Sequence, residues 1–493
     1  MLPIKLRNCF LNRKTYMGQR ITMGEKVGYS LGDVAANLVF QMMMIYQLKF
    51  YTDIFGLDGA VAGTVLLIAP IASAFVDPFI GIITDRTNTR WGKYRPWLIW
   101  TAIPFCVFYV LAFWNPGIHD KTLVAVYATV SYLLLLTMYG FNNTPFASLG
   151  GVMTNDIQER TSINKVRFIC TSVAQFVVQG FTLPLVDRFS NGDAAHGWVC
   201  TISLFAILAL IFLFISFLST RERIQPPPQQ TMSVRDDVRE TFTNVPWRVV
   251  FMLTLLLFIG LAMWGSSTNF YFQCYLDQEA LGNFLQVFGF NLSATSAYTI
   301  GFSVFNTLNA VVQFMGVLFL SEYLANRFGK KTTFMVGLSL CAFFTAMFYL
   351  PSPNEVGLVY LLCLLKSLCY APTIPLLWAM VADVADHVEY LNHRRATGFC
   401  FSGIIFALKS GMGIGGAIAG LILSVFGFVP GIGSLQSETA VWGIRLVSSL
   451  VPAMLFVMGV VTLCFYPITT YYNEKMQAEL THRRQMSQRS FKK

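Results

Sequence analysis

Twelve long apolar runs constrain this chain more than any other feature of its sequence. They lie at about 29–52, 59–84, 96–115, 122–146, 165–187, 197–219, 248–276, 295–321, 332–351, 356–384, 398–428 and 441–467. A helix needs about 20 apolar residues to cross the hydrocarbon core of a bilayer, whereas a barrel strand needs about ten. Inside hydrocarbon every backbone polar group must be satisfied within the protein. The sequence therefore predicts an all-α membrane protein with twelve transmembrane helices.

The composition excludes several other classes of protein. Of the 493 residues, 12% are charged, against about 25% in a typical soluble domain. The net charge is +10, but no soluble stretch is long enough to form a basic face for nucleic acid. The ten cysteines include no C-x-x-C pair and indicate neither a disulfide framework nor a metal site. The N-terminus shows no small-residue cleavage site, so we expect no removable signal peptide.

The positions of Lys and Arg predict the orientation of the chain. With the N-terminus placed inside, the inside segments hold 29 of the 35 Lys and Arg residues. This asymmetry follows the positive-inside rule and accounts for the basic net charge. Both termini are therefore predicted to be cytoplasmic.

A central loop with three consecutive prolines divides the chain into two halves. An Asp-Arg or Asn-Arg pair followed by Gly-Lys occurs at the same place in each half, at 85–93 and 326–330. This indicates an internal repeat, although any cytoplasmic loop can collect Arg and Lys. Two parallel six-helix repeats around a central site form the major facilitator fold. The predicted segments are a cytoplasmic segment 1–28, a six-helix bundle 29–219, the loop 220–247, a second six-helix bundle 248–467 and a basic cytoplasmic tail 468–493.

Asp77 is the first candidate for coupling transport to a cation. It lies beside Pro78 in the second apolar run, and a charge at the bilayer centre costs about 2.5–3.5 kcal/mol on insertion scales. A desolvated carboxylate can load and release a proton, or it can ligate a small cation. The alternative is a structural ion pair with a basic residue on another helix, for which Arg167 and Lys409 are the plausible partners.

Polar residues on the first and fourth runs are candidates for the cavity. Asp33 and Asn37 lie at i and i+4 on one helix face. Asp33 is a second coupling candidate, or else it caps or pairs at the cytoplasmic end, and Asn37 is a turn deeper. Near the end of the fourth run, Tyr139 and Asn143 are candidates. The amides there offer donors and acceptors that suit sugar hydroxyls. Asn142 and Asn143 point about a quarter turn apart, so at most one of them lines the cavity squarely.

Basic and aromatic residues complete the predicted binding site. Arg167 either reaches inward, where its fork can bind hydroxyl pairs, a carboxylate or a sulfonate, or it snorkels to the lipid headgroups. Lys409 lies about ten residues into the run 398–428, a depth that disfavours snorkelling. Lys366 is placed similarly in the tenth run. Trp378 is a candidate for stacking on a sugar ring, although aromatics at helical spacing more often serve packing.

Charged residues at the cytoplasmic ends are predicted to act in gating. They are Asp85, Arg86, Arg90, Lys93, Asp383 and Glu389. The acidic string that begins at Asp383 matches no zinc spacing, so we expect it to pair with the basic cytoplasmic loops. The chain has no Walker loop, nucleophile elbow, H-E-x-x-H or dinucleotide fingerprint in a credible context. We therefore expect no cofactor, no metal and no enzymatic activity.

These motifs resemble those of the glycoside–pentoside–hexuronide:cation symporters. The resemblance covers nearly the whole chain and is strongest at Tyr29 to Asn37, Phe50 to Asp53, Asp77-Pro78, Asn88 to Pro96 with Arg90-Trp91-Gly92-Lys93, Ala382-Asp383 with Glu389, and Lys409. It implies uptake of a sugar coupled to H⁺ or Na⁺ across a bacterial inner membrane.

Two departures from the family's melibiose carrier bear on the coupling cation. Where that carrier has a further carboxylate and an asparagine beside the Asp77 position, this chain has Ser73 and Val76. Fewer oxygen ligands argue against Na⁺ and leave Asp77 as a lone protonatable group. We therefore favour H⁺ as the coupling cation.

Two other departures bear on the charge of the sugar. The carrier's two sugar-holding aspartates fall on Asn37 and Asn143, while the positions of Arg167 and Lys409 remain basic. An arginine left without its acid partner favours a ligand that brings one. This predicts an anionic sugar, a hexuronide or a sulfosugar such as sulfoquinovose, with neutral pentosides as the alternative.

The sequence thus predicts a secondary transporter that works as a monomer with a sugar, a coupling cation and the lipid bilayer as partners. The alternatives are an exporter or antiporter of a sugar-derived metabolite, a Na⁺-coupled symporter of a neutral glycoside, and a non-transporting receptor or enzyme. The buried charges and the absence of a sensory domain disfavour the last.

Overall fold

In the part of the chain that the computed structural model describes, the regular elements are all helices. The described residues are 21–154, 157–223, 243–290, 294–392, 397–431, 433–469, 471–476 and 479–480. We call residues 21–223 the N-half and residues 243–480 the C-half. Three of the predicted segments lie mostly outside the described residues: the N-terminal segment 1–28, the loop 220–247 and the tail 468–493.

Within each half, the helices follow one another with short connections. Those of the N-half are α2 (Met23–Ile45), α3 (Gln47–Lys49), η1 (Phe50–Ile54), α4 (Gly59–Arg86), α5 (Arg95–Trp100), α6 (Ala102–Ala112), α7 (Lys121–Met153), α8 (Ile157–Ser190) and α9 (Ala194–Ser219). Those of the C-half are α11 (Val245–Phe270), η2 (Tyr271–Tyr275), α12 (Gln278–Gln286), α13 (Ala294–Phe319), α14 (Ser321–Phe328), α15 (Lys330–Met347), α16 (Val356–Tyr370), α17 (Thr373–Asn392), α18 (Thr397–Val425), η3 (Gly433–Leu435), α19 (Glu438–Ser448) and α20 (Leu450–Cys464).

Each of the twelve predicted runs coincides with helix. Ten helical segments in the described ranges are long and apolar enough to cross a membrane. The runs at 29–52 and 332–351 form the remaining two segments, α2 with its continuation and α15. Both begin with charged or polar residues, such as Glu25 and Lys26 in α2, which lower their mean hydropathy.

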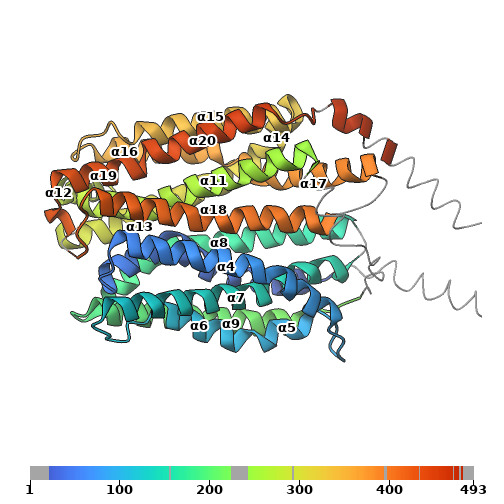
Figure 1. Cartoon of the computed structure of the whole chain (residues 1–493), viewed down its shortest axis with the longest axis horizontal. Helices are drawn as coiled ribbons and strands as arrows, with labels where there is room; N and C mark the ends of the chain where they lie inside the picture. Colours follow the sequence, from blue (N-terminus) through green and yellow to red (C-terminus); the bar gives the residue numbers. More distant parts are fainter. Residues whose placement is uncertain are drawn as a thin grey trace, which may run out of the picture.

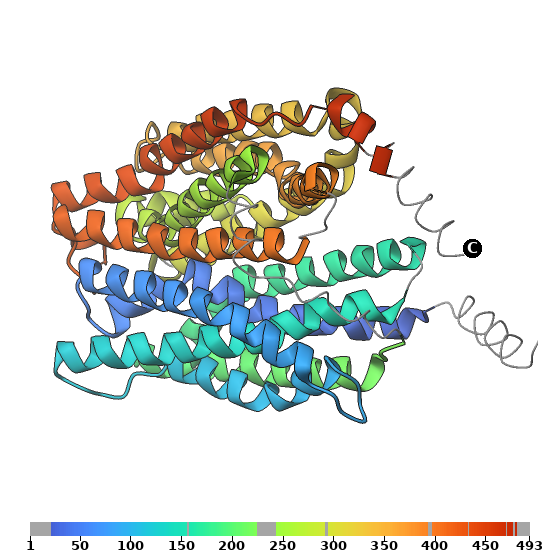
Figure 2. The same ribbon diagram turned by 45° about the vertical axis from the view of Figure 1, so that its right-hand side comes forward.

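The two halves pack against each other mainly through α4 and α18 (Figure 2). Figure 1 shows α18 between α11 of its own half and α4 of the other. Glycines allow the close approach. A Cβ atom on Gly420 would lie 2.1 Å from the carbonyl oxygen of Gly59, and one on Gly63 would lie 2.8 Å from that of Ala417. A larger residue at either position would push the halves apart.

Each half carries a π-helix at the same end of the bundle. Following the orientation that the sequence predicts, we call the end where α2 begins and α9 finishes the inner end, and the end where α4 and α12 begin the outer end (right and left in Figure 1). At the outer end, the first long helix of each half finishes in a π-helix, η1 or η2. The internal repeat therefore extends to this local distortion, a type often found at functional sites.

Candidate functional site

An ion pair between Asp77 and Lys409 joins the two halves near the middle of the bundle. Asp77 comes from α4 and Lys409 from α18, and the ammonium group also donates to Ser73 Oγ at 3.4 Å. Only 11% of the Lys409 side chain and 21% of the Asp77 side chain are exposed. Of the two partners that the sequence suggested for Asp77, the structure brings Lys409 to it.

The second oxygen of Asp77 lies against helix α7. This atom, Oδ1, is buried and has no hydrogen-bond partner. A Cβ atom on Gly140 would lie 2.8 Å from it, so glycine is what admits the carboxylate here. Gly140 was not among the predicted site residues. An unpartnered carboxylate oxygen is an atom to which a proton can add.

A second ion pair lies within the N-half. Arg167 Nε on α8 lies 2.5 Å from Asp33 Oδ2 on α2. Asn37 donates to the Asp33 carbonyl oxygen at 2.9 Å and lies 3.4 Å from its carboxylate oxygen Oδ1. The guanidinium group of Arg167 also rests on the ring of Phe146, 5.7 Å from the centroid. Asp33, Asn37 and Arg167 thus form one connected group.

This pair corrects one step of the sequence argument. The prediction of an anionic sugar assumed that Arg167 lacks an acid partner, because the resemblance placed amides at Asn37 and Asn143. The structure supplies the acid from Asp33, one helical turn before Asn37. The premise of an unpaired arginine is therefore wrong. The sequence could not show this, because the contact depends on how α2 packs against α8.

The remaining predicted binding residues occupy different surroundings. Tyr139 packs on Phe40 with ring centroids 6.3 Å apart and lies within electrostatic range of Asp33, Arg167 and Asp77. Asn142 is buried and donates to Thr101 Oγ1 at 3.0 Å, whereas Asn143 is only half-buried. Trp378 on α17 is 39% exposed. Lys366 is buried inside the C-half, with its ammonium 2.9 Å from the centroid of the Trp264 ring.

The loop that carries Arg90 and Lys93 is held by a residue that the sequence did not single out. Glu222, just after α9, accepts the backbone N–H groups of Lys93, Tyr94 and Arg95 at 2.7–2.9 Å. Gly92 has φ +118°, and its Cβ position is filled by the Glu222 carboxylate at 2.5 Å. The guanidinium group of Arg90 lies on the Trp91 ring, 4.8 Å from its centroid. The side chains of Asp85 and Arg86 lie outside the described residues.

Three ion pairs among the described residues of the inner end join two residues of the same half. Lys330 Nζ lies 2.8 and 2.7 Å from the two oxygens of Asp383, which also accepts from Asn473. Asp383 therefore pairs with the basic loop after α14, as the sequence analysis expected of this acidic string. Glu389 lies six residues further along α17. In the N-half, Lys26 pairs with Glu159 at 2.8 Å and Arg223 pairs with Glu25 at 2.6 Å.

At the outer end, hydrogen bonds cross from one half to the other. Lys49 of α3 bonds Gln273 of η2 across the interface, and Ser424 of α18 donates to Asp58 at 2.8 Å. Lys49 was not among the predicted site residues. The signal that could have found it was its position beside the motif Phe50 to Asp53.

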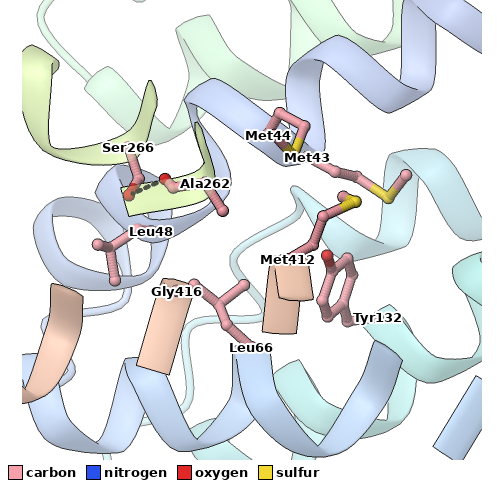
Figure 3. Close-up of a pocket in the computed structure, with 9 residues that line it drawn as sticks. All are labelled: Met43, Met44, Leu48, Leu66, Tyr132, Ala262, Ser266, Met412 and Gly416. Carbon is pink, nitrogen blue, oxygen red and sulfur yellow. Dashed lines mark hydrogen bonds between the residues drawn. The ribbon is translucent and has the colours of Figure 1, made fainter. Parts of the chain in front are cut away.

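A small pocket lies between the halves, on the outer side of the central ion pair. Its lining comes from both halves and is mostly apolar, with the side chains gathered as Figure 3 shows. The lining residues are Met43, Met44, Leu48, Leu66, Tyr132, Ala262, Ser266, Met412 and Gly416. Leu48 is adjacent to Lys49, and Met412 is one turn beyond Lys409 on α18. The pocket therefore lies between the hydrogen bonds that join the halves at the outer end and the ion pair of Asp77 with Lys409.

Comparison with known proteins decides the family. A family model described as MFS/sugar transport protein matches residues 28–470. The chain belongs to the MFS/sugar transport protein family. The isoprimeverose transporter of Lactiplantibacillus pentosus is 32% identical over 93% of this chain and 91% of its own length. The inner membrane symporter YicJ of Escherichia coli (strain K12) is 29% identical over 96% of this chain and 97% of its own length.

The fold of this member of the MFS/sugar transport protein family also matches solved transporters. A bacterial homolog of the human lysosomal transporter Spinster gives a TM-score of 0.63 at 14% identity, over 90% of this chain and 98% of that chain. The major facilitator fold and the resemblance to glycoside–pentoside–hexuronide:cation symporters are confirmed. The prediction that the chain is a multi-pass inner-membrane transporter and not an enzyme is confirmed as well.

Proposed function

We propose that this chain is a proton-coupled symporter that carries a glycoside into the cell between its two halves. The observation that carries the proposal is the Asp77–Lys409 pair, which crosses the halves and leaves Asp77 Oδ1 unpartnered. Protonation of Asp77 would neutralise the partner of Lys409 and weaken this contact. A proton that prefers one arrangement of the halves shifts the protein toward it, and the sugar can do the same.

The surroundings of Asp77 favour a proton over Na⁺. Sodium would need several oxygen ligands, whereas here the Lys409 ammonium lies between Asp77 and Ser73. A second cation beside this ammonium would meet like-charge repulsion. When Lys409 withdraws, the carboxylate is left as an uncompensated negative charge, and the proton neutralises it.

The two closed ion pairs favour a neutral sugar. Arg167 has Asp33 and Lys409 has Asp77, so a neutral glycoside can bind without leaving a buried charge unpaired. Hydroxyl groups suit the amides of Asn37 and Asn143 and the phenol of Tyr139. A hexuronide or sulfosugar would instead have to replace Asp33 at Arg167. The similarity to an isoprimeverose transporter supports a glycoside substrate.

We further propose that the protein works as a monomer. We also propose that its inner end lies in the cytoplasm, because the inside segments carry the excess of Lys and Arg. In this orientation, the cross-half bonds at the outer end close the path to the outside. The gating roles expected of Arg90, Lys93, Asp383 and Glu389 belong to the opposite end. They remain part of the proposal, together with Asp85 and Arg86.

Uptake into right-side-out membrane vesicles tests the proposal. The vesicles receive a panel of labelled neutral and anionic sugars with an imposed H⁺ gradient or an imposed Na⁺ gradient. We expect a neutral glycoside to accumulate with the H⁺ gradient alone. Stimulation by Na⁺ would overturn the coupling argument, uptake of only anionic sugars would overturn the substrate argument, and accumulation in inverted vesicles alone would indicate export.

A further inference from the structure

A buried lysine at the outer end reaches from one half of the protein into the other. The side chain of Lys49 is 8% exposed. Its ammonium group bonds Gln273 of η2 and lies over two rings of the C-half, 5.8 Å from the centroid of Phe270 and 5.3 Å from that of Tyr298. These three groups form a socket, which we call the Lys49 socket.

The socket is fixed by further contacts inside the C-half. The hydroxyl group of Tyr298 donates to Asn269, one turn before Gln273, so α13 and α11 are tied together beside the lysine. Gln273 lies in η2, and Lys49 directly precedes η1. The π-helical ends of the two repeats therefore present the lysine and its acceptor to each other.

Lys49 carries its own counterion. Asp53 of η1 lies 2.6 Å from Lys49 Nζ, and its other oxygen accepts from Thr52 at 3.1 Å. Because Lys49 and Asp53 belong to the same half, they stay together when the halves separate. The pair neutralises the ammonium while it is buried, which is the state in which an isolated charge would be costly. Water can solvate the ammonium once the outer end opens.

We propose that Lys49 is the latch of the outer gate, and that the Lys49 socket sets how readily the halves part at that end. Closing buries the neutralised ammonium among Gln273, Phe270 and Tyr298. Opening loses one hydrogen bond and two cation–π contacts, an amount small enough to be reversed in each cycle. The inference goes beyond the proposed function, since it concerns the gate irrespective of which sugar or cation is carried.

Cys274 offers a reporter for this gate. It is buried beside Gln273, within electrostatic range of Lys49 and Asp53. The test is the rate at which a membrane-impermeant maleimide, added outside to right-side-out vesicles, modifies Cys274, with the site read by mass spectrometry. This readout needs no substrate, so it can fail or succeed independently of the transport assay.

Three variants separate the latch from simple structural damage. Gln273→Leu removes the cross-half acceptor and should raise the modification rate roughly two- to tenfold. Asp53→Asn leaves a buried ammonium without its counterion and should raise the rate by at least about tenfold. In Lys49→Met/Asp53→Asn the charge is gone, an apolar side chain fills the socket, and the rate should fall back toward that of the unmodified protein.

The matched control is Gln278→Leu. Gln278 lies five residues beyond Gln273 and donates only to carbonyl groups of its own half, those of Phe272 and Leu276. It should leave the rate unchanged. Equal rates in the Gln273 and Gln278 variants would overturn the latch. Failure of the double variant to close again would overturn the role of the buried charge.

Discussion

The Arg167 guanidinium and the Asp33 carboxylate face each other at 2.5 Å, and in the proposed function this contact decides how the sugar site is charged. The arginine side chain is 36% exposed while the aspartate is 10% exposed, so a ligand can reach the arginine. Arg167 is held by Asp33, yet it remains open to a competing anion. The charge of the preferred sugar should therefore depend on Asp33.

Replacing Asp33 by Asn should shift the preference toward anionic sugars. The guanidinium of Arg167 would lose its carboxylate and would gain from a ligand that brings one. We expect the ratio of affinities, anionic over neutral, to rise at least about tenfold, since charged hydrogen bonds contribute roughly 1.5–3 kcal/mol. Competition of unlabelled glycosides and glucuronides against a labelled substrate measures this ratio. An unchanged ratio would show that Arg167 does not face the substrate.

Replacing Asp77 by Asn should uncouple transport from the proton gradient. The amide of asparagine does not take up a proton near neutral pH, so accumulation driven by an imposed H⁺ gradient should be lost. Exchange of labelled for unlabelled sugar at equal concentrations needs no net proton movement and should persist. Asp120→Asn is the matched control, because Asp120 is another acid of the N-half and its carboxylate accepts the N–H groups of Thr122 and Leu123 in its own half. It should leave both measurements unchanged.

Lys409→Met should destabilise the protein unless Asp77 is changed with it. Removing one partner of a buried ion pair costs about 3–5 kcal/mol, whereas replacing both is often neutral. The thermal midpoint in detergent should fall in Lys409→Met and recover in Lys409→Met/Asp77→Asn. If the double variant were as unstable as the single one, packing of the lysine chain against α4 would be what matters, in place of its charge.

The sequence predicted the helices and the two halves because long apolar runs and positive-inside charges act locally. It also named Arg167 and Lys409, the bases of the ion pairs with Asp33 and Asp77. It could not assign each base to its acid, because Asp33 and Arg167 are 134 residues apart and their approach depends on how α2 packs on α8.

The missed residues share a different cause. Lys49, Gln273 and Glu222 act through contacts with distant backbone or with the opposite half. Apart from the i,i+4 pair of Lys49 with Asp53, none of them stands in a recognisable spacing with its partner. Their roles follow from the π-helical ends and from the fold of the loop after α4, which the pattern of apolar residues does not encode.

Gly92→Ala should destabilise the protein more than Gly117→Ala does. Both glycines have positive φ, +118° for Gly92 and +71° for Gly117, so alanine is strained at both. At Gly117 a Cβ atom would meet open space, whereas at Gly92 it would lie 2.5 Å from the carboxylate of Glu222. Alanine at Gly92 therefore also displaces the acceptor of three backbone N–H groups. We expect the thermal midpoint to fall further in Gly92→Ala, and Glu222→Ala combined with it to add little, since both break the same anchor. Equal losses at the two glycines would mean that backbone strain alone, and not the Glu222 anchor, requires glycine in this loop.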